Sequence, residues 1–189
     1  MKNRLIICSL MILIITIGCG KDDNADNPIY FIGDSQVSNW DTEYSFPNRV
    51  TKNWGKEGAK LLYLERLKDI DTNADIVIEI GTNDLQTSWA ATMVEEYVEK
   101  YIEVVMSLPG RRKYVVEVFP TSNLNKNRVI QIFNYKLKEG IKQNDFVEII
   151  EVYDKLESDG VLKDSFTRDG VHLNDYGYMV VTNEVNRII

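Results

Sequence analysis

The sequence predicts a three-layer α/β/α fold around a five-stranded parallel sheet. Short apolar segments alternate along the chain with longer segments of helical periodicity, which is the order that parallel strands joined by crossover helices require. The apolar segments are continuous rather than alternating, as is typical of strands that helices cover on both faces. A length of 189 residues, with 44% hydrophobic and 27% charged residues, suits one such domain.

Five short segments have the apolar composition of buried strands. In chain order they are Ile29–Ile32, Arg49–Asn53, Ile76–Ile80, Tyr114–Phe119 and Phe146–Val152. The first of them ends at Gly33, and the second has the weakest apolar character. We therefore expect one strand from each segment, all of them in the same sheet.

Four segments follow the period of a helix with one apolar face. They are Lys60–Lys68, Thr92–Leu108, Lys126–Lys142 and a last helix that runs from the N-cap residue Asn174 to Ile189. The clearest is the second, where apolar residues recur at i, i+3, i+4 and i+7 and Pro109-Gly110 ends the helix. Each helix follows a strand, which completes the alternation.

The first 28 residues are expected to lie outside the folded domain. Lys2 and Arg4 precede an apolar run of 14 residues, Leu5–Gly18, which is the pattern of a secretory signal. That run is shorter than the ~20 residues that span a bilayer as a helix, so an uncleaved membrane anchor is the less favoured alternative. We divide the chain into a signal peptide (1–18), a polar tether (19–28) and one domain (29–189).

The end of the apolar run resembles a bacterial lipobox. Gly18 precedes Cys19, which would be lipidated after cleavage, although Thr16 stands where the lipobox usually has Leu. Lys21-Asp22-Asp23 resembles a signal that sends lipoproteins to the outer face of some Gram-negative cells. The resemblance implies an exported protein that is anchored through Cys19 to the outer membrane, with exposure at the cell surface.

Charge and composition exclude several functions. The net charge of −7 disfavours a nucleic-acid partner, which requires a basic surface. A single His and two Cys exclude a His-rich metal site or a zinc finger. We expect neither a metal nor a cofactor, and the sequence leaves the oligomeric state open.

Four short motifs follow strands or lie in a late loop. They are Gly33-Asp34-Ser35, Asn53–Gly58, Gly81–Asp84 and Asp169-Gly170-Val171-His172. Each alone is an ordinary turn, but the carboxyl ends of parallel strands meet at one edge of a sheet, where ligands bind. Ser35 needs a base to become a nucleophile, and His172 is the only His. Asp169 precedes it by three residues and can orient its ring.

These motifs resemble those of the SGNH (GDSL) hydrolase family. Its four named residues match Ser35, Gly55, Asn83 and His172 in order, and Asp169 completes the triad. The resemblance extends from Tyr30 to about Tyr178, and Gln36 stands where the GDSL motif has Leu. It implies a flavodoxin-like α/β/α fold and hydrolysis of acyl esters.

The resemblance also implies a role for each site residue. Ser35 attacks the ester carbonyl, His172 moves the proton and Asp169 holds the imidazole. The oxyanion hole consists of the backbone N–H groups of Ser35 and Gly55 and the side-chain amide of Asn83. Two further aspartates, Asp34 and Asp84, are expected to stabilise their turns.

Three tryptophans and three glutamates occupy unusual positions. We expect Trp54 to pack in the core, whereas Trp40 and Trp89 either pack or face the substrate at the rim of the site, where an indole can contact a sugar ring or an acyl group. Glutamates interrupt three apolar strands, and we expect Lys or Arg side chains to pair with them because buried carboxylates are costly. These glutamates are Glu79, Glu117 and Glu148.

The residues together favour a lipid-anchored serine esterase that removes short O-acyl groups, most simply acetyl groups, from carbohydrate. One alternative is a lysophospholipase or thioesterase for longer acyl chains. However, the loops after the third and fourth strands leave no segment for a lid or a deep apolar tunnel. The other is a non-catalytic glycan-binding lipoprotein, which a complete set of catalytic residues disfavours.

Overall fold

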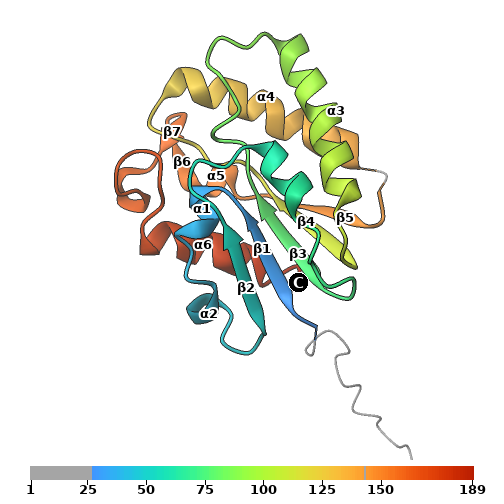
Figure 1. The fold of residues 1–189 in the computed structure, drawn as a ribbon. Helices are drawn as coiled ribbons and strands as arrows, with labels where there is room; N and C mark the ends of the chain where they lie inside the picture. Colours follow the sequence, from blue (N-terminus) through green and yellow to red (C-terminus); the bar gives the residue numbers. More distant parts are fainter. Residues whose placement is uncertain (1–26, 143) are drawn as a thin grey trace, which may run out of the picture.

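The sheet in the computed structural model, which describes residues 27–142 and 144–189, has five parallel strands, as predicted. The strands are β1 (Ile29–Gly33), β2 (Thr51–Gly55), β3 (Asp75–Glu79), β4 (Arg112–Val116) and β5 (Val147–Ile150). Their order is β2-β1-β3-β4-β5, and each pair is parallel (Figure 1). This is the flavodoxin-like order, and the chain reverses its direction of winding between β1 and β3.

Helices cover both faces of the sheet, which completes the expected three layers (Figure 1). On one face lie the 3₁₀ helix η1 (Leu61–Arg66), α3 (Ala91–Ser107) and α4 (Leu124–Ile141). On the other lie α1 (Ser35–Ser38), α2 (Thr42–Ser45), α5 (Tyr153–Leu156) and α6 (Asp175–Val185). Consecutive strand residues point to opposite faces, so Tyr30 and Ile32 belong to the first core and Ile29 and Phe31 to the second.

Several elements differ from the sequence prediction. The segment expected to form an α-helix at 60–68 forms only the short helix η1, and its N-terminal residue Lys60 provides no side-chain cap. The last helix ends at Val185 rather than at Ile189. The remaining short elements were not predicted, and they comprise α1, α2, α5, the hairpin of β6 (Glu157–Ser158) and β7 (Val161–Leu162), and η2 (Asp164–Phe166).

The three strand glutamates do not find the expected cationic partners. The Glu117 carboxylate accepts hydrogen bonds from the backbone N–H groups of Val152 and Tyr153, both at 2.9 Å, and so fixes the start of α5. Glu148 is exposed on the edge strand β5, where its charge remains hydrated. Glu79 is completely buried beneath the site described below. The expected Lys and Arg partners were wrong because backbone donors, water and a second carboxyl group replace them.

The proposed signal peptide, the lipidation site Cys19 and most of the tether lie outside the described residues. Within the part of the chain that the structure does describe, none of the helices is both long and apolar enough to cross a membrane. The sheet and its helices lie within residues 29–189.

Candidate active site

Ser35 lies where β1 meets α1, at the carboxyl edge of the sheet. The Asp34 side chain caps α1 by accepting a hydrogen bond from the Gln36 N–H at 2.9 Å. Ser35 is the first residue of this helix, so its N–H has no partner within the helix. The cap thus holds the Ser35 hydroxyl at the surface while its neighbours Asp34 and Gln36 are buried.

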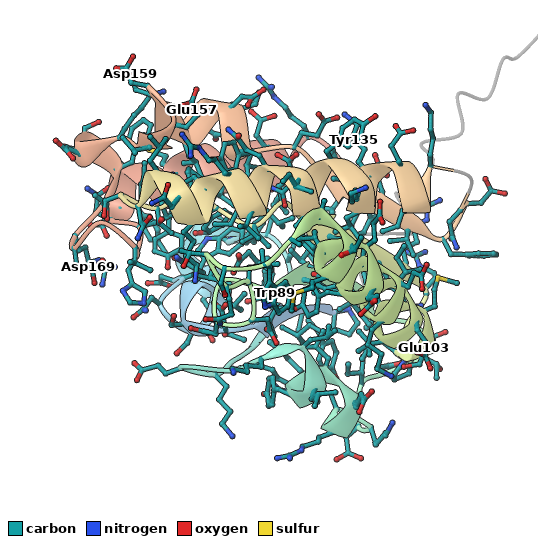
Figure 2. The ribbon with its side chains drawn as sticks, turned by 90° about the horizontal axis from the view of Figure 1, so that it is seen from above. Trp89, Glu103, Tyr135, Glu157, Asp159 and Asp169 are labelled. Atoms are coloured by element: carbon teal, nitrogen blue, oxygen red, sulfur yellow. The ribbon has the colours of Figure 1, made fainter. Side chains whose placement is uncertain are left out.

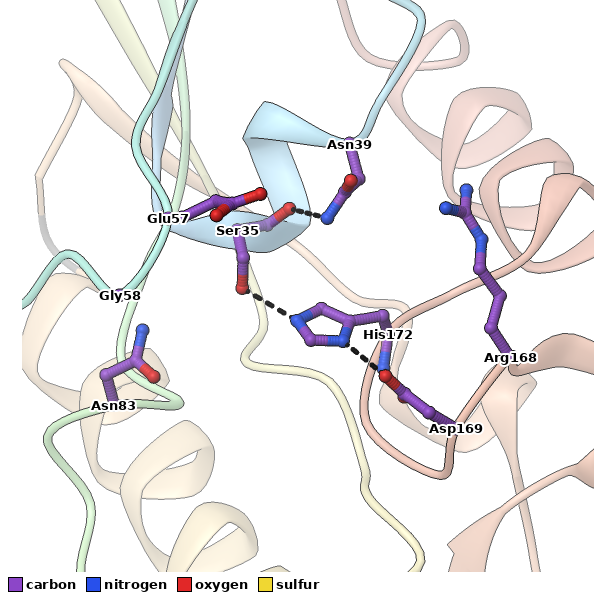
Figure 3. A pocket seen from close by; sticks show the side chains of 8 residues that line it. All are labelled: Ser35, Asn39, Glu57, Gly58, Asn83, Arg168, Asp169 and His172. Atoms are coloured by element: carbon purple, nitrogen blue, oxygen red, sulfur yellow. Dashed lines mark hydrogen bonds and ion pairs between the residues drawn. The ribbon is translucent and has the colours of Figure 1, made fainter.

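The structure brings together Ser35, His172 and Asp169, which are far apart in the sequence (Figure 3). The Ser35 Oγ lies 3.0 Å from the His172 Nε2, and the His172 Nδ1 lies 2.7 Å from an Asp169 carboxylate oxygen. Hydrogen bonds from the His172 side chain and from the N–H groups of His172 and Val171 hold the pKa of Asp169 well below its usual range. Asp169 is therefore ionised and fixes the ring with Nδ1 protonated, so that Nε2 faces Ser35 as an acceptor.

A hydrogen-bonded loop holds the Asp–His pair. The Thr167 hydroxyl donates to the His172 carbonyl at 2.8 Å and accepts from the Gly170 N–H at 2.9 Å. The Arg168 N–H donates to the same His172 carbonyl at 3.0 Å, and Thr167 pairs with Leu173 as an isolated antiparallel bridge. The geometry of the pair is thus set by the loop backbone together with the Thr167 hydroxyl.

Gln36 joins this loop to the nucleophile's helix. Its amide donates to the Val171 carbonyl at 2.7 Å, and its amide oxygen lies 3.4 Å from the Leu173 N–H. These two peptide groups flank His172, so the residue beside the nucleophile fixes the backbone on both sides of the base. The sequence marked Gln36 only as a departure from the GDSL motif, and Leu at this position could make neither contact.

The structure assigns the pocket glycine differently from the sequence. The Gly55 N–H donates to the Asn53 side chain at 2.9 Å, and Gly55 does not line the pocket around Ser35. A Cβ atom at position 55 would lie 2.1 Å from the Ser38 nitrogen, so this glycine allows β2 to approach α1. Gly58 lines the pocket instead, with a left-handed φ of 66°, and no described residue accepts a hydrogen bond from its N–H. Both glycines occur in one short motif, so the spacing alone did not distinguish them.

Asn83 lies opposite His172 across the pocket (Figure 3). Its amide nitrogen donates to the Ala59 carbonyl at 2.9 Å and makes a long contact of 3.4 Å with an Asp34 carboxylate oxygen. The first bond fixes the orientation of the amide. The second is weak enough for an oxyanion in the pocket to replace it.

Two buried carboxyl groups lie beneath the site. Burial, assisted by the nearby Asp84 carboxylate, raises the pKa of Asp34 to about 6. Burial and the adjacent Asp34 also raise the pKa of Glu79 well above its ordinary value. No N–H donor among the described residues reaches the Glu79 oxygens, so we expect Glu79 to be protonated and to donate its proton to Asp34. Asp84 accepts a hydrogen bond from the Leu61 N–H at 3.1 Å, a structural role like the one expected.

The pocket in front of Ser35 has a volume of about 480 Å³ and a polar lining. Its residues are Ser35, Asn39, Glu57, Gly58, Asn83, Arg168, Asp169 and His172 (Figure 3). Among the residues that the structure describes, no large apolar side chain lines it. Asn39 and Arg168 were not identified from the sequence because they lie outside its motifs, and Glu57 lies within the motif Asn53–Gly58 but had no role assigned to it.

The structure does not bring Trp40 or Trp89 to this pocket, and it shows both rings in packed positions, the first of the two alternatives that the sequence left open. Trp40 is 2% exposed and stacks on Tyr178 with ring centres 5.9 Å apart, while its indole N–H bonds Ser45 and Thr182. The Trp89 ring packs against the Tyr97 ring with centres 5.3 Å apart, and Trp89 lies far from Asp169 (Figure 2). Distance along the sequence from Ser35 or Asn83 does not give the direction of a side chain, and the core attracts large aromatic rings.

No group of three or more His, Cys, Asp or Glu side chains in the described residues could hold a metal ion. The arrangement around Ser35 needs none for acyl transfer, because nucleophile, base and hydrogen-bond donors are all side chains or backbone groups.

Known structures share this fold. A protein from Streptococcus pneumonia whose name refers to platelet activating factor is 24% identical, and the match covers 88% of this chain and 85% of that one with a TM-score of 0.69. A lipolytic protein of the G-D-S-L family from Veillonella parvula is 18% identical, with coverages of 86% and 97% and a TM-score of 0.67. A catalytic mutant of an acetylxylan esterase from Geobacillus stearothermophilus is 15% identical, with coverages of 87% and 94% and a TM-score of 0.66.

A curated relative is similar in sequence to this chain. The N-acylneuraminate cytidylyltransferase of Escherichia coli O18:K1:H7 (strain RS218 / NMEC) is 28% identical over 170 residues, which are 85% of this chain and 40% of that protein. The chain thus spans about two fifths of the length of the relative that it matches. No protein-family model matches the chain.

The strand order and the structural likenesses define the class of protein. It is a flavodoxin-like α/β/α protein with a Ser-His-Asp constellation at the carboxyl edge of its sheet. More narrowly, the chain has the SGNH hydrolase fold, the fold of the G-D-S-L lipolytic proteins, which confirms the fold that the sequence motifs implied.

Proposed function

We propose that the chain is a serine esterase that hydrolyses short O-acyl esters of carbohydrate. The observation that carries the proposal is the continuous path from Ser35 Oγ through the His172 ring to the Asp169 carboxylate, with spacings of 3.0 and 2.7 Å. A serine hydroxyl is a weak nucleophile unless an adjacent base accepts its proton. His172 is the base that this geometry provides.

The reaction would proceed in two displacements. The Ser35 oxygen attacks the ester carbonyl carbon while its proton passes to the His172 Nε2. His172 then donates this proton to the leaving alcohol, and an acyl-Ser35 ester remains. Water, deprotonated by the same nitrogen, attacks this ester and releases the carboxylic acid, while His172 returns the proton to the departing Ser35 oxygen. Asp169 stabilises the imidazolium that forms in each step.

Three donors would stabilise the oxyanion of each tetrahedral intermediate. They are the N–H of Ser35, the N–H of Gly58 and the side-chain amide of Asn83, all of which belong to the pocket-lining residues. Gly58 replaces Gly55 in this role, because the Gly55 N–H is already bonded to Asn53. Preorganised donors of this kind are usually the largest catalytic contribution, about 3 kcal/mol each.

The polar lining of the pocket favours a short acyl group. Each methylene that an apolar wall buries contributes ~0.8 kcal/mol to binding, and this pocket offers no large apolar side chain among its described residues. The acetylxylan esterase among the similar structures removes acetyl groups from a polysaccharide, as its name states, and the curated relative acts on an N-acyl sugar. These names support acetyl esters of sugars as the first candidates.

The proposal includes a location outside the cytoplasm. The lipobox-like sequence before Cys19 supports lipid attachment and anchoring to the bacterial outer membrane, where the domain would meet extracellular or periplasmic glycans. Replacement of Cys19 by Ser should release the protein from the membrane fraction and leave its esterase activity unchanged. Detection of the wild-type protein without lipid would contradict the anchor.

The substrate class can be tested with p-nitrophenyl esters from acetate to palmitate, together with acetylated xylan and O-acetylated N-acetylneuraminate. We expect kcat/KM to be highest for acetyl to butyryl esters and to fall for longer chains. An increase in kcat/KM out to octanoyl or longer esters would favour the lysophospholipase or thioesterase alternative. Absence of turnover of every ester would favour a non-catalytic glycan-binding protein.

A further inference from the structure

A second hollow adjoins the catalytic pocket. It has a volume of about 630 Å³, and Asn39 lines both cavities. The Asn39 amide donates to the Ser35 carbonyl at 2.8 Å, so the residue that separates the two cavities is tied to the helix of the nucleophile. Residues of α2 and α6 line the hollow, and both helices lie on the face of the sheet opposite α3 and α4 (Figure 1). The two cavities therefore meet at Asn39.

Exposed aromatic rings form the walls of this hollow. Tyr44 of α2 is 84% exposed and Tyr176 of α6 is 67% exposed, and both line it. Met179, one turn after Tyr176, is also exposed there, at 58%. Large side chains with so much exposed surface, gathered from two separate elements beside a catalytic pocket, are typical of a binding surface.

The floor of the hollow is rigid. It is formed by the buried rings of Trp40 and Tyr178, which stack with centres 5.9 Å apart. The Trp40 N–H bonds Ser45 and Thr182 at 3.1 Å, and the Tyr178 hydroxyl donates to the Gln36 carbonyl at 2.7 Å. A preformed floor reduces the entropy that a ligand must lose on binding.

Two carboxylates determine which ligand fits. Asp41 and Asp175 both line the hollow, and neither forms an ion pair with any described residue. An acyl chain would remove water from both carboxylates without replacing its hydrogen bonds, and an anionic group would be repelled. Hydroxyl groups, in contrast, donate strong hydrogen bonds to carboxylates. A neutral sugar fits this combination, because its ring packs on flat aromatic rings and its hydroxyl groups donate hydrogen bonds to the carboxylates.

We propose that this hollow is a sugar-binding subsite, which holds the ring next to the acylated one in an oligosaccharide substrate. The proposal rests on the proposed esterase function and assigns the glycan specificity to Tyr44 and Tyr176 rather than to the tryptophans. The acylated ring occupies the pocket at Ser35, the chain passes Asn39, and the neighbouring ring lies against the two tyrosines with its hydroxyl groups toward Asp41 and Asp175.

The test compares substrates with one ring and with several. We would measure kcat/KM for O-acetylated methyl xyloside, for O-acetylated xylo-oligosaccharides and for p-nitrophenyl acetate. The wild-type enzyme should prefer the oligosaccharides to the single ring by about tenfold, because only a second sugar ring reaches Tyr44 and Tyr176. Tyr44→Ala and Tyr176→Ala should lose most of this preference through an increase in KM.

Tyr135→Ala provides the matched control. Tyr135 is 66% exposed, like Tyr176, but it lies on α4, far from Asp169 (Figure 2). Its substitution should leave all three values of kcat/KM unchanged. Binding of unacetylated xylo-oligosaccharides to Ser35→Ala, followed through intrinsic tryptophan fluorescence or calorimetry, provides a readout that does not require turnover and should weaken severalfold with either tyrosine variant.

Two results would overturn the subsite. One is a wild-type enzyme that hydrolyses p-nitrophenyl acetate but does not distinguish one ring from several. The other is retention of the preference in both tyrosine variants. If instead the tyrosine variants lose activity selectively toward long-chain p-nitrophenyl esters, the hollow binds acyl chains and the subsite is wrong. Failure of the wild-type enzyme to hydrolyse p-nitrophenyl acetate would reject the proposed function itself.

Discussion

Gln36 fixes the two peptide groups on either side of His172, through the Val171 carbonyl and the Leu173 N–H. Gln36→Leu keeps nearly the same side-chain volume at this buried position. It leaves both peptide groups without a partner, at a cost of about 1–3 kcal/mol. We expect kcat to fall at least about tenfold with a smaller change in KM, because His172 would lose its position relative to Ser35. Steady-state kinetics with p-nitrophenyl acetate would measure this. Gln131→Leu, on the exposed surface of α4, should have no effect.

Asn83 permits a test of the oxyanion hole. Asn83→Ala removes one donor, and we expect kcat to fall by about 10²–10³ with a nearly unchanged KM, since the oxyanion exists only in the intermediates and transition states. Asn83 also bonds the Ala59 carbonyl, so thermal unfolding should accompany the kinetics. A loss of kcat below tenfold in a folded variant would remove Asn83 from the oxyanion hole.

The triad residues could be predicted from the sequence, whereas the residues around them could not. Ser35, His172 and Asp169 are required by chemistry, and the chain contains only one His. Gly58 was confused with Gly55 because both satisfy the same motif, and only the hydrogen bond from the Gly55 N–H to Asn53 distinguishes them. Contacts such as these depend on backbone direction, which the spacing of residues does not encode.

At the scale of elements, the loop from Thr167 to Leu173 positions the base. Thr167→Val keeps the shape of the side chain but removes the hydroxyl that joins the His172 carbonyl to the Gly170 N–H. We expect kcat to fall about tenfold while the melting temperature changes little, because surface loops contribute less to stability than the core. Thr72→Val, in an exposed turn before β3, is the control. A loss of activity that merely follows a loss of folded protein would reject the positioning role.

The two long helices were predicted well. α3 and α4 begin and end within about two residues of the expected limits, since 17 and 18 residues repeat the apolar pattern several times. The four-residue helices α1, α2 and α5 contain about one turn each, which is too short for any periodicity. These short helices nevertheless position Ser35, Tyr44 and the end of β5. The site therefore depends on the elements that are hardest to predict.

At the scale of the whole molecule, the buried Asp34–Glu79 pair makes stability depend on pH. Both pKa values are raised in the folded state, that of Asp34 to about 6, so the folded protein retains protons that the unfolded chain releases. The stability that these groups contribute is present at acid pH and is lost as the pH rises through their folded-state values. We therefore expect the free energy of unfolding in urea to fall as the pH rises through about 6, the folded-state pKa of Asp34.

Glu79→Gln should reduce this pH dependence. The amide is neutral at every pH and can donate a hydrogen bond to Asp34 in place of the Glu79 proton. The stability of the variant relative to that of the wild type should therefore be greater at alkaline pH than at acid pH. Glu148→Gln, at an exposed position, should follow the wild-type curve. An identical pH dependence in the wild type and in Glu79→Gln would contradict the shared proton.

The central claim is that Ser35 is an activated nucleophile. The most direct measurement is intact-protein and peptide mass spectrometry after treatment with an alkyl fluorophosphonate, which forms a stable phosphonyl ester only with a serine that an adjacent base activates. We expect one adduct, on Ser35, together with complete loss of esterase activity, and neither labelling nor hydrolysis in Ser35→Ala. A folded wild-type protein that remains unlabelled, or a Ser35→Ala variant that still hydrolyses p-nitrophenyl acetate, would contradict the account.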